Sequence, residues 1–170
     1  YTEWVEIVSP AEAYLDITYN KMDIPFARRT AQLIRSDLYR QLGFRARIGI
    51  APNKMLAKMA SASEEGQAIC EVIRGQFDEF LHNKSILLLP YIGPKTKEKL
   101  VDAQIETVGQ LVQIDQAALR ALCGRQASLL WQLARGHDDQ PVCPAAETIG
   151  CQAQFSASLY ALDEVRNGLR

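Results

Sequence analysis

Residues suited to disulfide or metal chemistry are scarce in this sequence. Its four cysteines, at positions 70, 123, 143 and 151, form no CxxC pair, and the last two are too isolated for a zinc knuckle. The dense cysteine framework of small secreted domains is absent as well. We therefore predict reduced thiols in an intracellular protein.

Long apolar runs and an excess of either charge are also missing. No apolar stretch approaches the roughly 18–20 residues that a transmembrane helix needs, and the first residues, YTEWVEIV, lack the basic-then-apolar order of a signal peptide. Lysine and arginine number 19 against 20 acidic residues, so any anion-binding surface must be a local patch. With 48% apolar residues among 170, we predict a soluble globular protein with one compact core or two small ones and no membrane partner.

Both ends of the sequence have the character of interrupted elements. Position 1 is tyrosine rather than methionine, and a strand pattern has already begun by Trp4. The last residues, EVRNGLR, lie within an amphipathic helix pattern. We therefore expect a fragment of a longer protein whose sheet continues in earlier strands.

The first part of the chain alternates between strand and helix patterns. Residues 3–8 and 13–18 are rich in β-branched and aromatic types and flank SPAE, which predicts a hairpin. The following elements are a helix from Pro25 to Gly43, a strand at 45–50, a helix capped by Asn53 and a short strand at 69–73. This order predicts an α+β layer in which two helices cover one face of one sheet.

From about Phe77 onward the pattern becomes helical. After FDEFL, short helices are predicted at 94–102, 107–113, 115–122 and 125–135, separated by glycines at 93, 109, 124 and 136. Asp115 is a good N-cap for the third of them. Residues 136–146 are polar, contain two prolines and suit a linker. A strand pattern at 147–156 and a helix pattern at 161–169 then predict the start of another unit.

The helix that begins after Asn53 carries two lysines in its first turns. Lys54 and Lys58 are four residues apart and share one face, where the helix dipole and the free N–H groups already favour an anion. This arrangement suits a polyphosphate. The alternative is a pair of solvated lysines without a ligand.

The second strand of the hairpin carries two carboxylates. Glu12 and Asp16 share one face of the strand, while Ala13, Leu15 and Ile17 share the other. Paired carboxylates at an open site suit Mg²⁺, which takes one or two of them together with substrate phosphates. The alternative is a pair of ordinary half-exposed acidic residues.

The segment LLLPYIGPKTKEKL, followed by IETVGQL, predicts a hairpin between two helices. Ile92 and Gly93 form its tight turn, whose backbone N–H groups can contact a DNA phosphate. The next helix carries Lys95, Lys97 and Lys99, which add attraction independent of base sequence. The alternative is a solvated lysine-rich helix.

Taken together and in this order, these segments resemble the Y-family (translesion) DNA polymerases. SPAEAYLDIT resembles the Ser-x-Asp-Glu-Ala-Tyr-Leu-Asp motif of the palm, and GIAPNKMLAKMAS is similar to the Gly-Ile-x-x-Asn-Lys-x-Leu-Ala-Lys-x-Ala-Ser motif. LPYIGPKTKEKL with ETVGQL resembles the helix–hairpin–helix of the thumb. LARGHDDQPV is similar to the segment that leaves the thumb, and ETIGCQAQF to the first strand of the little-finger domain. These motifs, at compatible spacings, cover nearly the whole chain.

The resemblance implies template-directed nucleotidyl transfer onto a primer 3′ end during damage bypass and the SOS response. Its partners would be primer–template DNA, an incoming deoxynucleoside triphosphate, two Mg²⁺ ions and the sliding clamp. It implies a location in the bacterial cytoplasm at the nucleoid, or in a nucleus. The implied units are a palm remainder (1–76), a helical thumb with helix–hairpin–helix (77–136), a linker (137–146) and the start of an α+β little-finger domain (147–170).

The resemblance also implies roles for particular residues. Glu12 matches a catalytic, metal-proximal carboxylate, and Lys58 matches the lysine that contacts the phosphates of the incoming nucleotide. Asn53 and Lys54 belong to the same phosphate motif and hold its loop-to-helix corner. The thumb hairpin that grips the duplex backbone is matched by Ile92, Gly93 and Lys95, with Lys97 beside them.

Three departures from the family pattern matter. The catalytic aspartate before the glutamate is replaced by Ala11, whose methyl group binds no metal. The strand with the first metal-binding aspartate, and the fingers, would precede Tyr1. Residues 63–66 replace the usual Lys-Pro, and Tyr91 stands where the first glycine of the thumb hairpin often lies. We therefore predict that this chain does not polymerise.

Two other interpretations belong to different classes. A polymerase-like adaptor would keep the fold and lose catalytic carboxylates; Ala11 favours this reading, whereas the well-kept NKMLAK segment argues against it. A plain helix–hairpin–helix DNA-binding module would explain residues 88–135 but would leave both earlier motifs as coincidence.

Overall fold

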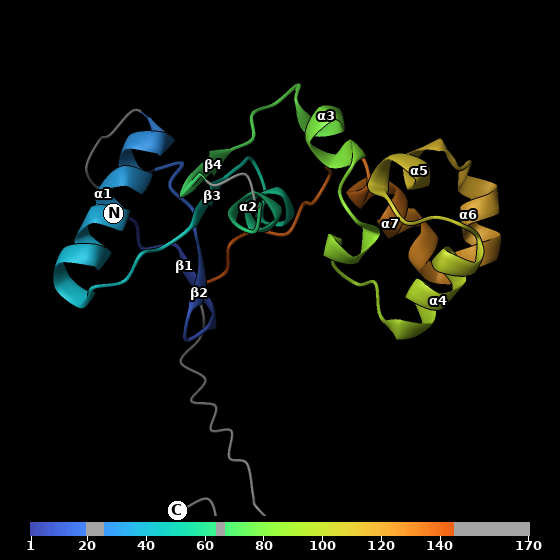
Figure 1. Ribbon diagram of the computed structural model, residues 1–170, viewed down its shortest axis with the longest axis horizontal. Coiled ribbons are helices and arrows are strands. Elements are labelled where there is room, and N and C mark those ends of the chain that lie inside the picture. Colours follow the sequence, from blue (N-terminus) through green and yellow to red (C-terminus); the bar gives the residue numbers. More distant parts are fainter. Residues whose placement is uncertain (20–25, 64–66, 145–170) are drawn as a thin grey trace, which may run out of the picture.

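The computed structural model describes residues 1–19, 26–63 and 67–144. Over these ranges the molecule is elongated, with strands and a long helix at one end and a group of short helices at the other (Figure 1). Helix α2 (Lys54–Ser61) lies between the two ends. The strand and the helix predicted at 147–156 and 161–169 lie outside the described residues.

The predicted hairpin is confirmed. Strands β1 (Val5–Ser9) and β2 (Glu12–Leu15) pair in antiparallel fashion, with an irregularity in register next to the turn. The two faces of β2 alternate as expected. The Leu15 side chain is 38% exposed, whereas Glu12 and Tyr14 are half-buried. The polar face of β2 is therefore the one that packs against the rest of the molecule.

Two further strands form a separate pair. β3 (Ile48–Ile50) and β4 (Ile69–Glu71) are parallel and occupy the predicted strands at 45–50 and 69–73, over shorter spans. The prediction of a single sheet is wrong for the described residues, where each sheet has two strands. The physical reason is that the hairpin is attached to α2 through side-chain ion pairs rather than to β3 through a backbone ladder.

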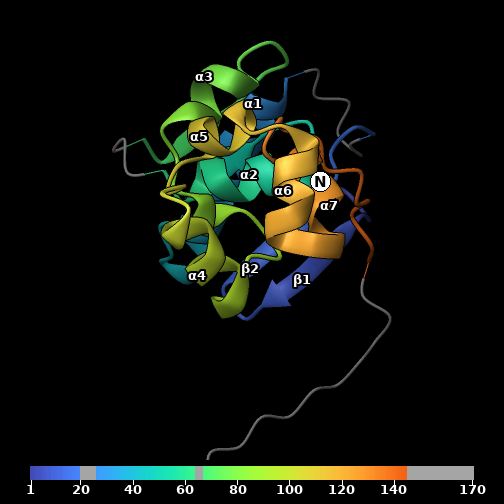
Figure 2. The ribbon, with the colours of Figure 1, turned by 90° about the vertical axis from the view of Figure 1, so that its right-hand side faces the viewer.

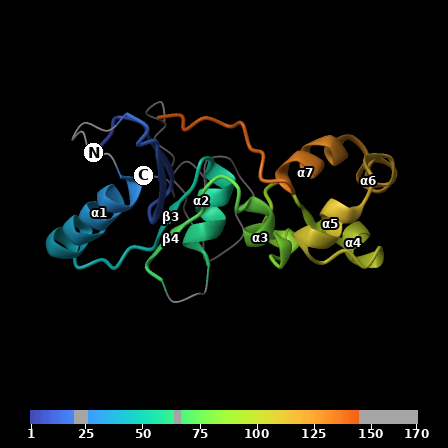
Figure 3. The same ribbon diagram turned by 90° about the horizontal axis from the view of Figure 1, so that it is seen from above.

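Helix α1 (Ala27–Leu42) packs on one side of the β3–β4 pair and α2 on the other (Figures 1 and 3). The prediction that two helices cover one face is therefore wrong, because the face of β3 that carries Gly49 is the one that contacts α2. Helix α1 ends at Gly43, whose φ of 73° is left-handed and suits a residue without a Cβ. Its predicted start at Pro25 lies outside the described residues. Seen from above, α1 lies at the end of the molecule opposite the short helices (Figure 3).

The contact between β3 and α2 requires a glycine. A Cβ built on Gly49 would lie 1.9 Å from the carbonyl oxygen of Ala57 and 2.6 Å from the backbone nitrogen of Ser61. On its apolar side, α2 inserts the buried Leu56 and Met59 into the core of the short helices. This helix therefore holds the β3–β4 pair and the helical part together.

The other end of the molecule is a cluster of short helices, shown facing the viewer in Figure 2. Its elements are α3 (Phe77–His82), the 3-10 helix η1 (Ile86–Leu88), α4 (Pro94–Asp102), α5 (Val108–Gln113), α6 (Gln116–Cys123), the 3-10 helix η2 (Gly124–Gln126) and α7 (Ala127–Leu133). The predicted helices are thus confirmed with small shifts at their ends. Leu100, Leu111, Leu119 and Leu130 are fully buried in the shared core. In the described residues, no helix combines the length and the apolar character that crossing a membrane demands.

One predicted helix separator has a different role. Gly109 lies inside α5 rather than between helices, so that prediction is wrong. A Cβ at this position would lie 2.6 Å from Nδ1 of His82 and 2.7 Å from its carbonyl oxygen. The glycine is needed because α3 and α5 approach each other closely here.

The segment after α7 returns to the strands. Residues 137–144 contain no helix or strand and run back past α2 toward the hairpin (Figures 1 and 3). The backbone N–H of Met55 donates to Asp138 Oδ2 at 3.1 Å, and the backbone N–H of Cys143 donates to Glu6 Oε2 at 2.9 Å. The described part of the predicted linker is therefore anchored at both ends.

Candidate functional site

The start of α2 is fixed by Asn53, as the sequence predicted. Asn53 has an extended backbone, and its Oδ1 accepts the N–H of Leu56 at 2.9 Å. Its Nδ2 donates to the carbonyl oxygen of Gly136 at 2.8 Å. One side chain therefore caps the helix and ties it to the end of the helical part, which sets the direction of the lysines that follow.

The structure brings two of the predicted site residues together. Nζ of Lys58 on α2 lies 2.7 Å from Oε1 of Glu12 on β2, and the side chains remain 54% and 37% exposed. The hydrogen bond to Glu12 raises the pKa of Lys58 above its usual value, against the smaller effect of burial. Two motifs that are 46 positions apart in the numbering therefore meet in one ion pair.

Lys54 forms a more buried ion pair with a residue that the sequence did not single out. Its Nζ lies 2.8 Å from the carboxylate of Glu6 on β1, with side-chain exposures of 14% and 23%. The same ammonium donates to the carbonyl oxygen of Pro141 and lies 5.2 Å from the centroid of the Tyr14 ring. Burial lowers the pKa of Lys54, but the hydrogen bond and the charge of Glu6 outweigh this effect and raise it.

These two pairs determine what the lysine face of α2 can bind. Each ammonium already has a carboxylate partner, so the face carries little net charge as it stands. The exposed Lys58–Glu12 pair can open at small cost because surface ion pairs contribute only about 0–1 kcal/mol. A phosphate would therefore reach Lys58 more readily than Lys54, which is held from several directions.

Asp16 does not join Glu12 in a shared site. Its Oδ1 accepts the N–H of Thr18 at 2.9 Å, which is a local turn contact. Among the residues that the structure describes, no group of three or more histidine, cysteine, aspartate or glutamate side chains could hold a metal ion. With Ala11 next to Glu12 and Glu12 paired to Lys58, the residues present do not fit a Mg²⁺ site, and no step through Mg²⁺ follows from this geometry.

The predicted DNA-binding residues lie at a different place. Ile92 is half-buried against the core, and Gly93 is the residue before the first turn of α4, which begins with Pro94. Lys95 and Lys97 are exposed on α4, far from the hairpin in both Figure 1 and Figure 3. Residues two apart on a helix do not share a face, so these lysines spread charge over two sides of α4.

The turn before α4 has the geometry that the family pattern assigns to a glycine. Tyr91 has a φ of 68°, a left-handed conformation that is uncommon for a residue with a side chain. The amide of Gln140 donates a hydrogen bond to the Tyr91 hydroxyl. This side-chain contact ties the hairpin turn to the segment that follows α7.

Sequence reasoning missed Glu6 and Asp138. Glu6 lies among alternating strand residues, and Asp138 lies in a polar stretch that the sequence treats as linker. No local sequence pattern predicts the partner of either residue, because Glu6 contacts Lys54 and Asp138 contacts Met55, and both partners are far away in the sequence. The only hint in the sequence was that Asp138 lies in LARGHDDQPV, a segment that resembles a family motif.

Replacing Glu6 with glutamine is expected to destabilise the protein by about 1–2 kcal/mol at neutral pH. The hydrogen bond from Lys54, followed by that from the Cys143 N–H, lowers the pKa of Glu6 below its ordinary value of 4.5. A carboxyl group with a lowered pKa stabilises the folded state above its unfolded pKa, and this contribution is lost as the pH falls through the folded value. Urea unfolding of wild type and variant should therefore differ at pH 7 and converge as the pH falls below 4.5 and through the lowered pKa. Glu79→Gln, at an exposed position on α3, is the matched control and should show no such difference.

Comparison with known proteins extends these observations. The profile of the family described as "IMS: impB/mucB/samB family" matches residues 1–62. The chain is 34% identical to the DNA polymerase IV of Desulfatibacillum aliphaticivorans over 166 residues, which cover 96% of this chain and 42% of that protein. This match extends well beyond residues 88–135, so the interpretation as a plain DNA-binding module is wrong.

Solved structures agree with the sequence match. The crystal structure of DinB from Sulfolobus solfataricus has a TM-score of 0.67 and 26% identity, covering 81% of this chain and 41% of that one. A Y-family DNA polymerase chimera has a TM-score of 0.70 and 25% identity, covering 84% of this chain and 42% of that one. The chain spans less than half the length of each protein it is compared with here. By sequence and by its mixed α+β fold, it is therefore a homologue of the Y-family DNA polymerases, as its motifs predicted.

Proposed function

We propose that this chain is the palm and thumb portion of a Y-family translesion DNA polymerase and does not polymerise by itself. The observation that carries the proposal is the Glu12–Lys58 ion pair, in which the palm motif and the phosphate motif meet at 2.7 Å. Homology to a DNA polymerase IV over nearly the whole chain supports the same assignment. The Y-family chimera, of similar fold, supports it independently.

Within this proposal the two lysines of α2 have different tasks. Lys58, exposed and held by one carboxylate, releases Glu12 and contacts the phosphates of an incoming deoxynucleoside triphosphate. Lys54, held by Glu6, Pro141 and the Tyr14 ring, stays in place and positions the corner together with Asn53. Glu12 is then the carboxylate nearest to the reacting phosphates.

The proposed thumb grips DNA through the backbone. Ile92 anchors the turn before α4 in the core. Gly93 has no side chain, so it leaves the first turn of α4 accessible to a phosphate, and Lys95 and Lys97 are exposed to solvent. Such contacts read no base sequence and fix only the position of the duplex. The proposed boundaries are 1–76 for the palm remainder, 77–136 for the thumb, 137–146 for the linker and 147–170 for the start of the little finger. The sliding clamp is a further proposed partner of the complete protein.

The direct test is binding of the 170-residue chain to a labelled primer–template duplex, followed by fluorescence anisotropy over a series of salt concentrations. Replacing Lys95 and Lys97 with alanine is expected to weaken binding about equally for every duplex sequence. The slope of log affinity against log salt should decrease by up to about 1.8, since each phosphate contact contributes about 0.9.

The control for this test removes the same charge elsewhere. Arg29→Ala with Arg74→Ala replaces two exposed cations outside the helical cluster, on α1 and after β4. This variant should keep the wild-type salt slope. A wild-type slope in the lysine variant, or no duplex binding at low salt, would refute the thumb assignment.

A non-catalytic adaptor is the second candidate, and Ala11 is the specific observation that favours it. The position lies in the exposed turn before Glu12, where its side chain is a methyl group. An adaptor binds no nucleotide, so Lys58 would not have to leave Glu12. The Lys58–Glu12 ion pair would then stay closed. Replacing Ala11 with aspartate separates the two candidates.

A further inference from the structure

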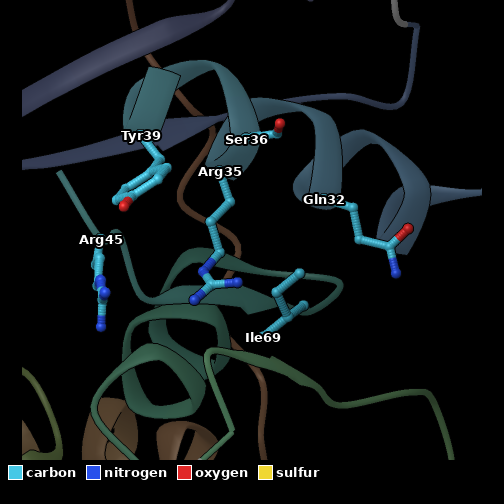
Figure 4. Close-up of a pocket in the computed structure, with 6 residues that line it drawn as sticks. All are labelled: Gln32, Arg35, Ser36, Tyr39, Arg45 and Ile69. Atoms are coloured by element: carbon cyan, nitrogen blue, oxygen red, sulfur yellow. The ribbon is translucent and has the colours of Figure 1, made fainter. Parts of the chain in front are cut away.

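A cavity of about 450 Å³ lies against α1 (Figure 4), and neither Glu12 nor Lys58 lines it. It is lined by Gln32, Arg35, Ser36 and Tyr39 of α1, by Arg45, and by Ile69 of β4. Its size is within the range of about 300–1,000 Å³ that small-molecule sites occupy. The proposed polymerase function uses none of these residues.

The surroundings of this cavity are strongly basic in a chain of net charge −1. Residues 26–47 contain arginines at positions 28, 29, 35, 40, 45 and 47 and a single acidic residue, Asp37. Asp37 is bound by Arg40 and by the Tyr1 hydroxyl, and Arg28 is paired with Glu71. In the part of the chain that the structure describes, neither arginine of the cavity has a carboxylate partner.

The two cavity arginines are placed to act together with an aromatic ring. Nε of Arg35 donates to the carbonyl oxygen of Ala46 at 3.3 Å, which fixes the side chain and leaves its two terminal nitrogens without a hydrogen bond to a described residue. The guanidinium carbon of Arg45 lies 5.8 Å from the centroid of the Tyr39 ring. Figure 4 shows Arg35, Arg45 and Tyr39 around the same space.

We propose that this cavity binds a nucleoside phosphate, either free or as one residue of a single strand. The guanidinium groups of Arg35 and Arg45 receive the phosphate, because a planar fork of donors matches its oxygens. The Tyr39 ring, 54% exposed, provides a face for the base. An acidic peptide would also satisfy the arginines, but it has no use for the adjoining exposed ring.

The test uses the full chain with Lys95 and Lys97 replaced by alanine, so that the proposed thumb contributes little and a failure of either proposal is seen separately. The probes are a labelled twelve-residue thymidine oligomer, followed by anisotropy, and thymidine triphosphate as competitor. Arg35→Gln with Arg45→Gln should weaken oligomer binding at least about tenfold, since two charge-assisted contacts are lost. Tyr39→Ala should weaken it about fivefold or more.

The matched control is Arg29→Gln with Arg74→Gln, which removes the same charge outside the cavity and should change binding less than about twofold. Arg45→Gln alone, at an exposed position, repeats the test if the double variant loses its helical circular dichroism. Competition by the triphosphate shows a site for free nucleotides, and binding of the oligomer alone shows a single-strand site. The proposal is overturned if neither probe binds, if the cavity and control variants weaken binding equally, or if a polyglutamate peptide competes as well as the nucleotide.

Discussion

Replacing Gly49 with alanine is expected to lower the free energy of unfolding by about 3 kcal/mol or more, because the new methyl group has no place to go. Its Cβ would lie 1.9 Å from the Ala57 oxygen and 2.6 Å from the Ser61 nitrogen, and both are backbone atoms of α2. A backbone neighbour cannot rotate away as a side chain can, so α2 must move off β3. Urea unfolding followed by circular dichroism measures the loss.

The same displacement would disturb the proposed site, since α2 carries Asn53 at its start together with Lys54 and Lys58. Gly93→Ala is the matched control, because nothing lies within 4 Å of a Cβ at that position. It should cost less than about 1 kcal/mol, the ordinary difference between glycine and alanine before a helix. A Gly49→Ala protein as stable as the control would show that β3 and α2 are not in backbone contact.

Placing an aspartate at position 11 is expected to raise polymerase activity at least about a hundredfold, since a lost metal ligand removes several kcal/mol of transition-state stabilisation. The background is a chimera in which this chain replaces the matching region of the Desulfatibacillum aliphaticivorans DNA polymerase IV. Position 11 adjoins Glu12 in the hairpin turn, so the new carboxylate would lie next to the existing one. Magnesium-dependent primer extension provides the measurement.

Ala13→Asp in the same chimera is the control, since it adds the same charge two positions along the strand, at another exposed site. It should leave primer extension at the level of the unmodified chimera. If the Ala11→Asp chimera is no more active than the unmodified chimera, position 11 is not the missing metal ligand. That result would support the adaptor hypothesis. Primer extension by the 170-residue chain alone would contradict the proposal that it does not polymerise.

The elements that the sequence predicted well are those whose signals are local. Asn53 caps α2 because its side chain reaches the N–H of Leu56, only three residues ahead. Asp115 caps α6 in the same way through the N–H of Ala118. Gly43 ends α1 because its left-handed backbone needs no partner elsewhere in the chain. Such contacts depend on a few neighbouring residues and are therefore visible in the sequence.

What the sequence did not show depends on packing between elements that are distant along the chain. Strand alternation divided β2 into two faces but did not show that Glu12 and Tyr14 would be the less exposed ones. Glycine often separates helices, yet Gly109 lies inside α5. It is needed there because His82 of α3 lies too close for a Cβ at this position. A glycine that permits a close approach and one that permits a turn are the same letter in a sequence.

The sequence by itself determined the helices, the hairpin and the family, because short-range spacing and motif order fix each of them. The tertiary structure alone decided that Glu6 holds Lys54, that Glu12 holds Lys58 and that Asp138 returns to the start of α2. It also gathered Arg35, Tyr39 and Arg45 around one cavity. These contacts arise when buried faces of separate elements are packed together, and packing places charged residues side by side that no local pattern connects.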